Sequence, residues 1–165
     1  MATHIRVETD TDHEALASIE AAADAVFGET GWDAPPSGAS RLDDPGFILV
    51  ASESQGGDAV GFAHVIEHEG GAHLEQVSVA PEFGQRGHGR ELVRAAIAQA
   101  AQRGHSRMTL RTFADVPWNA PFYASLGFRE APTPDELFHE QLAAIEAALG
   151  LEAFGRRVHM ELPLA

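Results

Sequence analysis

The residues with the most evident chemical use are the glycines of one turn, which reads Gly-Gln-Arg-Gly-His-Gly-Arg from Gly84 to Arg90. A segment with apolar residues at helical spacing follows the turn and ends at Gly104. Glycine lets the main chain approach a ligand closely, and the free N–H groups and the dipole of a helix start favour an anion. The turn therefore predicts a binding site for a phosphate group.

The glycine string is a weak signal when it stands alone. No Gly-Lys-Ser/Thr sequence follows it, so it is not a Walker loop, and it lacks the position and spacing of a dinucleotide fingerprint. The alternative is a helix that simply needed a tight turn at its start. Other segments of the chain have to decide between the two.

A second set of candidate ligands combines histidine with glutamate: His64, Glu67, His68, Glu69 and His73. A His-x-x-x-His pair binds a metal ion from one face of a helix. This segment is expected to be a strand and a hairpin turn, where the same spacing gives poor geometry. The chain also has no cysteine that could add a thiolate. We therefore expect no metal site.

The elements that would position these residues alternate between strand and helix. Period-two patterns and β-branched residues predict strands at residues 5–9, 47–51, 59–68, 74–79, 108–111, 128–130 and 157–162. Helices are expected after residue 11, after the glycine turn, at residues 120–126 and between residues 133 and 150. The last helix is expected to bury Phe138, Leu142, Ile145 and Leu149.

This order of elements predicts an α/β fold in which a mixed central sheet of six to seven strands is flanked by helices. The strands between residues 47 and 79 follow one another through short turns, which predicts an antiparallel meander. The strand at 108–111 comes after a strand–helix crossover, so it should run parallel to the strand at 74–79. A chain of 165 residues is long enough for one domain, residues 1–165, and too short for two comfortable ones.

Composition and charge exclude several classes of partner. The chain carries 25 acidic and 11 basic residues, a formal net charge of -14. Nucleic-acid-binding proteins usually present a basic face, so we expect no nucleic acid partner. An acidic field attracts cationic ligands such as amines, although it also serves solubility. No apolar run reaches the length of a membrane span and no signal peptide opens the chain, so we expect a cytoplasmic protein with no membrane partner.

Two stretches together resemble the GNAT-type N-acetyltransferases. A strand that ends in Val77 to Pro81, then the glycine turn and an amphipathic helix, resembles the acetyl-CoA motif of that superfamily. The segment from Trp118 to Phe128, in which Tyr123 is followed by Leu-Gly-Phe, is similar to its second motif. The match covers most of the chain. It implies a single GNAT-type domain that moves the acetyl group of acetyl-CoA to a primary amine of a small molecule or peptide.

The resemblance also assigns the residues that bind CoA. Its pattern is Gln/Arg-x-x-Gly-x-Gly/Ala, but here Gly84 stands in the Gln/Arg place and Gln85 comes one residue later. The backbone amides of the turn would hold the pyrophosphate, while Val77 and Val79 would pair through the main chain with the pantetheine arm. The implied CoA-binding residues are Val77, Ser78, Val79, Gln85, Arg86, Gly87, His88, Gly89, Arg90 and Asn119.

The same resemblance suggests how the reaction is catalysed. Tyr123 stands where the family keeps the acid that protonates the leaving thiolate; the alternative is an aromatic ring that only packs along the CoA channel. The Val77 amide matches the donor to the developing oxyanion. Glu75 is our choice for the base that deprotonates the amine, directly or through water. An acidic strand residue can also be merely solvated, and three rivals for this role are His64, Glu67 and His73.

Without cysteine there is no thiol for a cysteine acyl-enzyme, so direct attack in a ternary complex is expected. Two other functions stay open: a CoA-binding regulatory module without turnover, and a nucleotide-phosphate binder that uses the same turn. The acceptor would be selected by the loop from Gly28 to Pro45, where Trp32 is expected to cover the core, and by the segment from Pro132 to Gly150. No sequence feature decides between a monomer and a homodimer.

Overall fold

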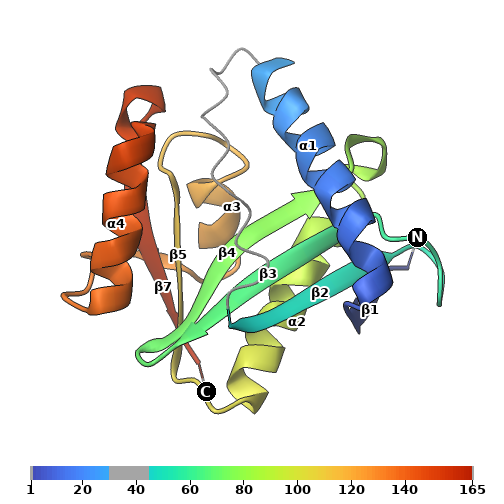
Figure 1. Cartoon of the computed structure of the whole chain (residues 1–165), viewed down its shortest axis with the longest axis horizontal. Coiled ribbons are helices and arrows are strands. Elements are labelled where there is room, and N and C mark those ends of the chain that lie inside the picture. The colour runs from blue at the N-terminus through green and yellow to red at the C-terminus, as the bar shows by residue number, and fades with distance from the viewer. Residues whose placement is uncertain (1, 30–44, 165) are drawn as a thin grey trace.

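The computed structural model describes residues 2–29 and 45–164 and contains one mixed sheet (Figure 1). Its seven strands lie in the order β1-β2-β3-β4-β5-β7-β6. They are β1 (His4–Val7), β2 (Gly46–Ser52), β3 (Gly61–His68), β4 (Gly71–Val79), β5 (Arg107–Phe113), β6 (Arg129–Glu130) and β7 (Arg157–Pro163). The α-helices are α1 (His13–Glu29), α2 (His88–Gln102), α3 (Ala120–Ala124) and α4 (Leu137–Leu149). Short 3-10 helices are η1 (Asp10–Asp12), η2 (Pro81–Phe83) and η3 (Leu151–Phe154).

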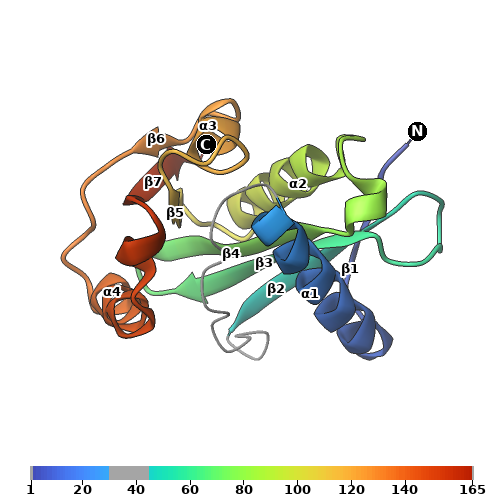
Figure 2. The same ribbon diagram turned by 90° about the horizontal axis from the view of Figure 1, so that it is seen from above.

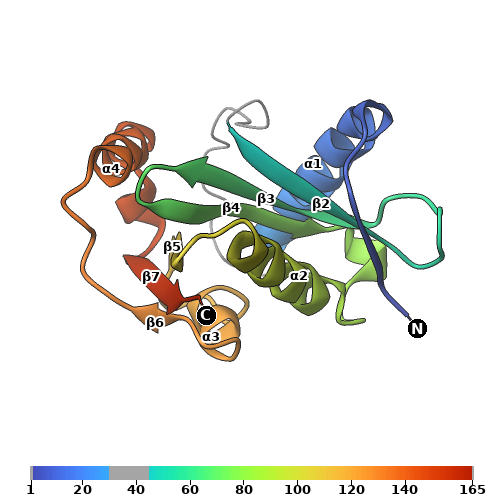
Figure 3. The same cartoon turned by 90° about the horizontal axis from the view of Figure 1, so that it is seen from below.

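The helices cover both faces of the sheet (Figures 2 and 3). Helices α2 and α3 lie on one face, and α1 and α4 lie on the other. The predicted meander is confirmed, because β1 to β4 pair antiparallel in chain order. The predicted parallel pair is confirmed as well, since β4 and β5 run parallel. The predicted α/β class with a mixed sheet of six to seven strands is therefore correct.

The core follows the helical period read from the sequence. The buried face of α2 packs on Leu74 of β4 and Met108 of β5 through its own residues Leu92, Val93, Ala96 and Ala100. On the opposite face, Leu16 and Ile19 of α1 pack on the side chain of Phe62. Helix α1 continues to Glu29, so the predicted start of the acceptor loop at Gly28 is wrong; residues 30–44 of that loop, including Trp32, lie outside the described residues.

Strand β4 contains a bulge at Glu75. His64 of β3 pairs with Gln76 and Val65 pairs with Leu74, so Glu75 is the one extra residue between them. Such a bulge adds a residue to one strand and shifts the alternation of its side chains. Before the bulge Leu74 faces α2; after it, Val77 and Val79 face that side. The side chain of Glu75 comes within 3.6 Å of His73, on the face that carries α1 and α4.

Strands β4 and β5 separate after only two paired positions. The parallel register contains Ala72 with Met108 and His73 with Thr109, and Figure 1 shows the two strands diverging from there. Among the residues that the structure describes, no strand pairs with this edge of β4 beyond the bulge, so the edge is open there. Because Ala80 donates to Val60 toward β3, alternation directs the main-chain groups of Val77 and Val79 to this open edge.

Helix α4 rests on a polar part of the sheet, which the sequence did not reveal. Leu142 is buried as predicted, but Ile145 is 42% exposed, so its predicted burial is wrong. The buried face instead contains His139 and Glu146. Glu146 accepts hydrogen bonds from Arg111 at 2.8 Å and from Arg157 at 3.0 Å. Burial alone would raise the pKa of Glu146, but the bonds and charges of the two arginines outweigh it and lower the pKa.

We expect Glu146→Ala to lower the free energy of unfolding by about 3 kcal/mol, because it leaves two largely buried guanidinium groups without their carboxylate. Urea unfolding followed by circular dichroism measures the change. Glu130→Ala is the matched control: its ion pair with Arg156 is 58% exposed on both sides, so the expected loss is below about 0.5 kcal/mol. Equal losses in the two variants would show that the bonds of Glu146 to Arg111 and Arg157 stabilise the protein no more than an exposed ion pair does.

Candidate active site

The glycine turn is built as an open helix start. Gly87 is the N-cap of α2 and has φ of 88°, a left-handed conformation that glycine adopts without strain. The first intrahelical bond runs from the Glu91 N–H to the Gly87 carbonyl, and none of the side chains that the structure describes caps the helix. Helix geometry therefore leaves the amides of His88, Gly89 and Arg90 without an acceptor inside α2. Gln85 precedes them, exposed and with a positive φ of 59°.

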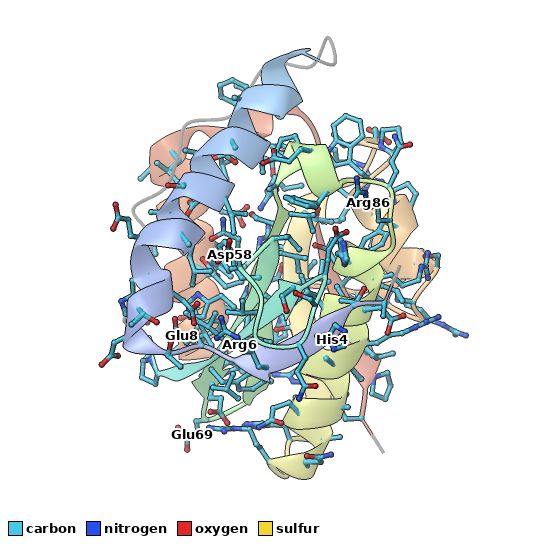
Figure 4. The ribbon with its side chains drawn as sticks, turned by 90° about the vertical axis from the view of Figure 1, so that its right-hand side faces the viewer. His4, Arg6, Glu8, Asp58, Glu69 and Arg86 are labelled. Carbon is cyan, nitrogen blue, oxygen red and sulfur yellow. The ribbon has the colours of Figure 1, made fainter. Side chains whose placement is uncertain are left out.

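The side chains of the turn are anchored away from these amides. Arg86, labelled in Figure 4 on the turn before α2, donates to both carboxylate oxygens of Glu53 at 2.9 Å. The buried ring of His88 bonds the same carboxylate at 2.7 Å through Nε2 and the Thr3 hydroxyl at 2.9 Å through Nδ1. The bonds from His88 and Arg86 lower the pKa of Glu53. Sequence reasoning missed Glu53, since nothing in the sequence connects it to a turn more than thirty residues away.

Gly89 is the point at which three predicted elements meet. A Cβ built on Gly89 would lie 3.9 Å from the side chain of Val79 on β4 and 4.0 Å from the ring of Phe122 on α3. The guanidinium of Arg90 lies over that ring at 5.5 Å and donates to the Ser125 hydroxyl at 2.9 Å. The start of α2, the open part of β4 and the second motif thus form one site. Ser125, the C-cap of α3, was not predicted to belong to this site. Its position one helical turn after Pro121 is the only indication of this in the sequence.

Tyr123 lies on the α2 and α3 side of the sheet. It packs against the cluster that includes Leu92 and Phe128, and its ring centre is 6.0 Å from that of Phe128. Burial raises the pKa of its phenol to about 12. Its amide donates to the carbonyl of Asn119, the N-cap of α3, at 3.0 Å. A phenol with this pKa keeps its proton throughout the neutral and alkaline range in which amines react.

The predicted base is on the other face of the sheet. Glu75 is partly buried, and its Oε2 lies 3.6 Å from Nε2 of His73. Of its three rivals, Glu67 is bound by Arg103 and His105 next to the C-terminal end of α2, and the bond to Arg103 is the main cause that lowers its pKa to about 2. His64 is buried in β3 opposite Gln76, and His73 is buried beside Glu75.

Ser78, one of the predicted CoA-binding residues, is buried, and alternation directs its main chain toward β3 rather than toward the open edge of β4.

Several histidines gather under α4. The ring centre of His139 lies 5.1 Å from that of His159 and 5.4 Å from that of His68, which stacks on Phe138. Burial is the main cause that lowers the pKa of all three, for His139 to about 4. Among the residues that the structure describes, no group of three or more acidic or histidine side chains is arranged to hold a metal ion. His139 and His159 are buried and His68 is partly buried, and the lowered pKa values keep the three rings uncharged at neutral pH.

Because of this cluster, we expect stability to fall as the pH drops from 6.5 toward 4. The unfolded chain takes up protons on these imidazoles near pH 6.5, whereas the folded protein takes them up only at lower pH, for His139 near pH 4, so acid favours the unfolded state. The expected loss is on the order of 2 kcal/mol, measured by urea unfolding at both ends of this range. His139→Leu should make the loss smaller. An unchanged loss in that variant would place the acid sensitivity elsewhere.

The split strand pair, the glycine-rich helix start and the phenol of Tyr123 are together the parts of an acetyl-CoA-dependent N-acyltransferase. Residues 12–128 match the sequence model of the acetyltransferase (GNAT) family, so the chain belongs to this family. The family uses acetyl-CoA, and the amides of the helix start fit its pyrophosphate. No helix within residues 2–29 and 45–164 has the length and apolar character needed to cross a membrane.

Solved structures share the fold across the whole chain. The ribosomal-protein-S18-alanine N-acetyltransferase from Escherichia coli is 23% identical, with a TM-score of 0.66 over 99% of this chain and 95% of that one. Nourseothricin acetyltransferase is also 23% identical, with a TM-score of 0.65 over the full length of both chains. The N-acetylglutamate synthase from Neisseria gonorrhoeae, complexed with coenzyme A and N-acetyl-glutamate, is 16% identical with a TM-score of 0.72 over all of this chain and 36% of that one.

Proposed function

We propose that this protein transfers the acetyl group of acetyl-CoA to the primary amine of a small molecule or peptide by direct attack in a ternary complex. The observation that carries the proposal is the meeting of three elements at Gly89, next to the gap between β4 and β5. Family membership favours this function over a regulatory CoA-binding module and over a nucleotide binder. The proposal includes one domain over residues 1–165 and a cytoplasmic location, and it leaves monomer and homodimer open.

Each residue has a separate role in the proposed site. Acetyl-CoA supplies an activated acetyl thioester. The amides from Arg86 to Arg90 bind its pyrophosphate, while the main chain of Val77 and Val79 pairs with the pantetheine arm at the open edge of β4. Asn119 contacts the same arm. The side chains of Arg86 and His88 hold the turn in shape through Glu53 rather than contacting the ligand.

Proton transfer is divided between the two faces of the sheet. Glu75 removes the proton that keeps the acceptor amine unreactive, since a primary ammonium has a pKa of about 10. The Val77 N–H donates to the carbonyl oxygen on which negative charge develops. Tyr123 gives its phenolic proton to the departing sulfur, and its pKa of about 12 ensures that the proton is present. Because Glu75 and Tyr123 approach from opposite faces of the sheet, both proton transfers can take place in one ternary complex.

A cationic acceptor fits the face that carries Glu75. Helix α1 brings Glu20 to Gln76, the neighbour of Glu75, and Asp24 lies one turn further along. Burial is the main cause that raises the pKa of both Glu20 and Asp24. A positively charged group would offset the cost of that burial. These acidic side chains, together with the net charge of -14, support an acceptor that carries more than one amino group.

Two measurements test the proposal. CoA and acetyl-CoA should raise the melting temperature, because a ligand that binds only the folded state stabilises it. A panel of simple amines, polyamines, aminoglycosides and peptide N-termini, assayed for free thiol, should then identify acceptors. Thermal stabilisation without thiol release for any amine would favour the regulatory module, and tighter binding of ATP than of CoA would favour the nucleotide binder.

A further inference from the structure

A chain of three side chains, two of them buried, ends at the proposed base. The Nδ1 atom of His73 lies 2.8 Å from the hydroxyl of Thr109 on β5, and its Nε2 atom lies 3.6 Å from Oε2 of Glu75. His73 and Thr109 are both buried and form one of the two paired positions of β4 and β5. The chain therefore starts at the last point where these strands pair and ends at the bulge where they separate.

The arrangement specifies where the proton of the imidazole lies. Thr109 can donate its hydroxyl hydrogen to Nδ1, which leaves the N–H of a neutral ring at Nε2. The opposite tautomer would place the Nε2 lone pair against a carboxylate, and two acceptors repel each other at this distance. A protonated ring also carries a hydrogen on Nε2. In every favourable state, then, His73 presents an N–H to Glu75.

We infer that His73 is a positioning residue for the reaction: Thr109 fixes its tautomer, and its Nε2–H holds the Glu75 carboxylate ionised and in place to receive the proton of the acceptor amine. The inference rests on the proposed function. In this step a proton passes from the acceptor nitrogen to a Glu75 oxygen, and the nitrogen lone pair becomes free to attack. The distance of 3.6 Å is long for a hydrogen bond, and such catalytic contacts shorten when substrates bind.

Within residues 2–29 and 45–164, aromatic rings lie next to His73. The ring of Phe138 covers His73 at 5.2 Å between ring centres, and His139 follows at 6.0 Å. Among the residues that the structure describes, the titratable groups near the pair are Glu20 on α1, His68 on β3, His139 on α4 and, behind it, His159 on β7. The three histidines are in turn bordered by the charged side chains of Arg107, Arg111, Glu136 and Glu161. Burial keeps these three histidines neutral at pH 7, so they add no charge that would replace the contribution of His73.

The pH dependence of kcat/KM tests the inference on the active enzyme. His73→Leu removes the donor, so the acidic limb of the profile should move up by about one pH unit and kcat/KM below the limb should fall about tenfold. His73→Gln keeps an N–H donor, so the acidic limb of its profile should return most of the way to the wild-type position. Thr109→Val, which frees the tautomer, should give a smaller shift in the same direction. The matched control is His159→Gln, an equally buried histidine that contacts Glu161 and should leave the limb in place.

A readout without turnover separates this inference from the proposed function. Nitrogen-15 NMR of the ligand-free protein should show the Nε2–H tautomer of His73, and Glu75→Gln should lower the pKa of that ring because a neighbouring negative charge is lost. An Nδ1–H tautomer, or a ring unaffected by Glu75→Gln, would overturn the inference even in an enzyme that acetylates amines. The expected tautomer in a protein that releases no thiol would overturn the proposed function, and with it the role in the reaction, while the contacts of His73 with Thr109 and Glu75 would stand. Should His73→Leu fail to fold, the Thr109→Val profile and the NMR result still decide.

Discussion

Replacing Tyr123 with phenylalanine should lower kcat about a hundredfold, within the range that a positioned general acid contributes. The ring keeps its packing against Phe128, so the loss comes from the phenolic proton alone. The affinity for CoA should stay within about twofold, because the amides at the start of α2 are untouched. Thiol release measures kcat, and thermal stabilisation by CoA serves as the control for binding and folding.

The raised pKa of Tyr123 also predicts how the effect of this substitution on kcat depends on pH. With a pKa of about 12, the phenol is protonated and competent across the whole assay range, so its titration should cause no loss of rate on the alkaline side up to about pH 10. The deficit of Tyr123→Phe should accordingly be the same at every pH in that range. A variant that retained more than about a third of wild-type kcat would show that the ring only packs beside the cofactor and that another group is the acid.

The second large effect is expected at the glycine turn, where Gly87→Ala should raise the dissociation constant for CoA at least tenfold. Gly87 has φ of 88° and open space around its missing Cβ, so alanine meets no steric clash and is opposed only by the backbone conformation. A left-handed conformation costs an L-residue about 1–2 kcal/mol. To relieve that strain the turn would rotate the amides of His88 and Gly89 away from the direction in which they meet a pyrophosphate.

Gly104 provides a matched control at the other end of the same helix. It has φ of 91° and nothing within 4 Å of a built Cβ, so Gly104→Ala carries a similar backbone cost. Both variants should therefore lose about 1–2 kcal/mol in the free energy of unfolding, but only Gly87→Ala should lose CoA affinity. Isothermal titration and urea unfolding measure the two quantities. Equal CoA affinities would mean that the turn does not bind the pyrophosphate through its main chain.

The sequence by itself determined the features that depend on short-range patterns. The meander of β2 to β4 and the helix after the glycine turn follow from residue periodicity and from turn residues such as Gly70-Gly71, which act within a few positions. Two motifs, each readable in a dozen residues, were sufficient to identify the acetyltransferase family. Glu75 and Tyr123 were singled out in the same way, since their positions relative to those motifs are fixed along the chain.

Only the tertiary structure decided which residues from distant segments meet. The bulge at Glu75 depends on the register against β3, and the chain from Thr109 through His73 depends on two strands pairing for two positions before they separate. Ile145 was predicted to be buried because apolar spacing marks a helix face. The face that docks instead is the one whose Glu146 meets Arg111 and Arg157, since leaving those charges buried without a partner would cost more than exposing one isoleucine. Such pairings join residues far apart in the chain, so no local pattern records them.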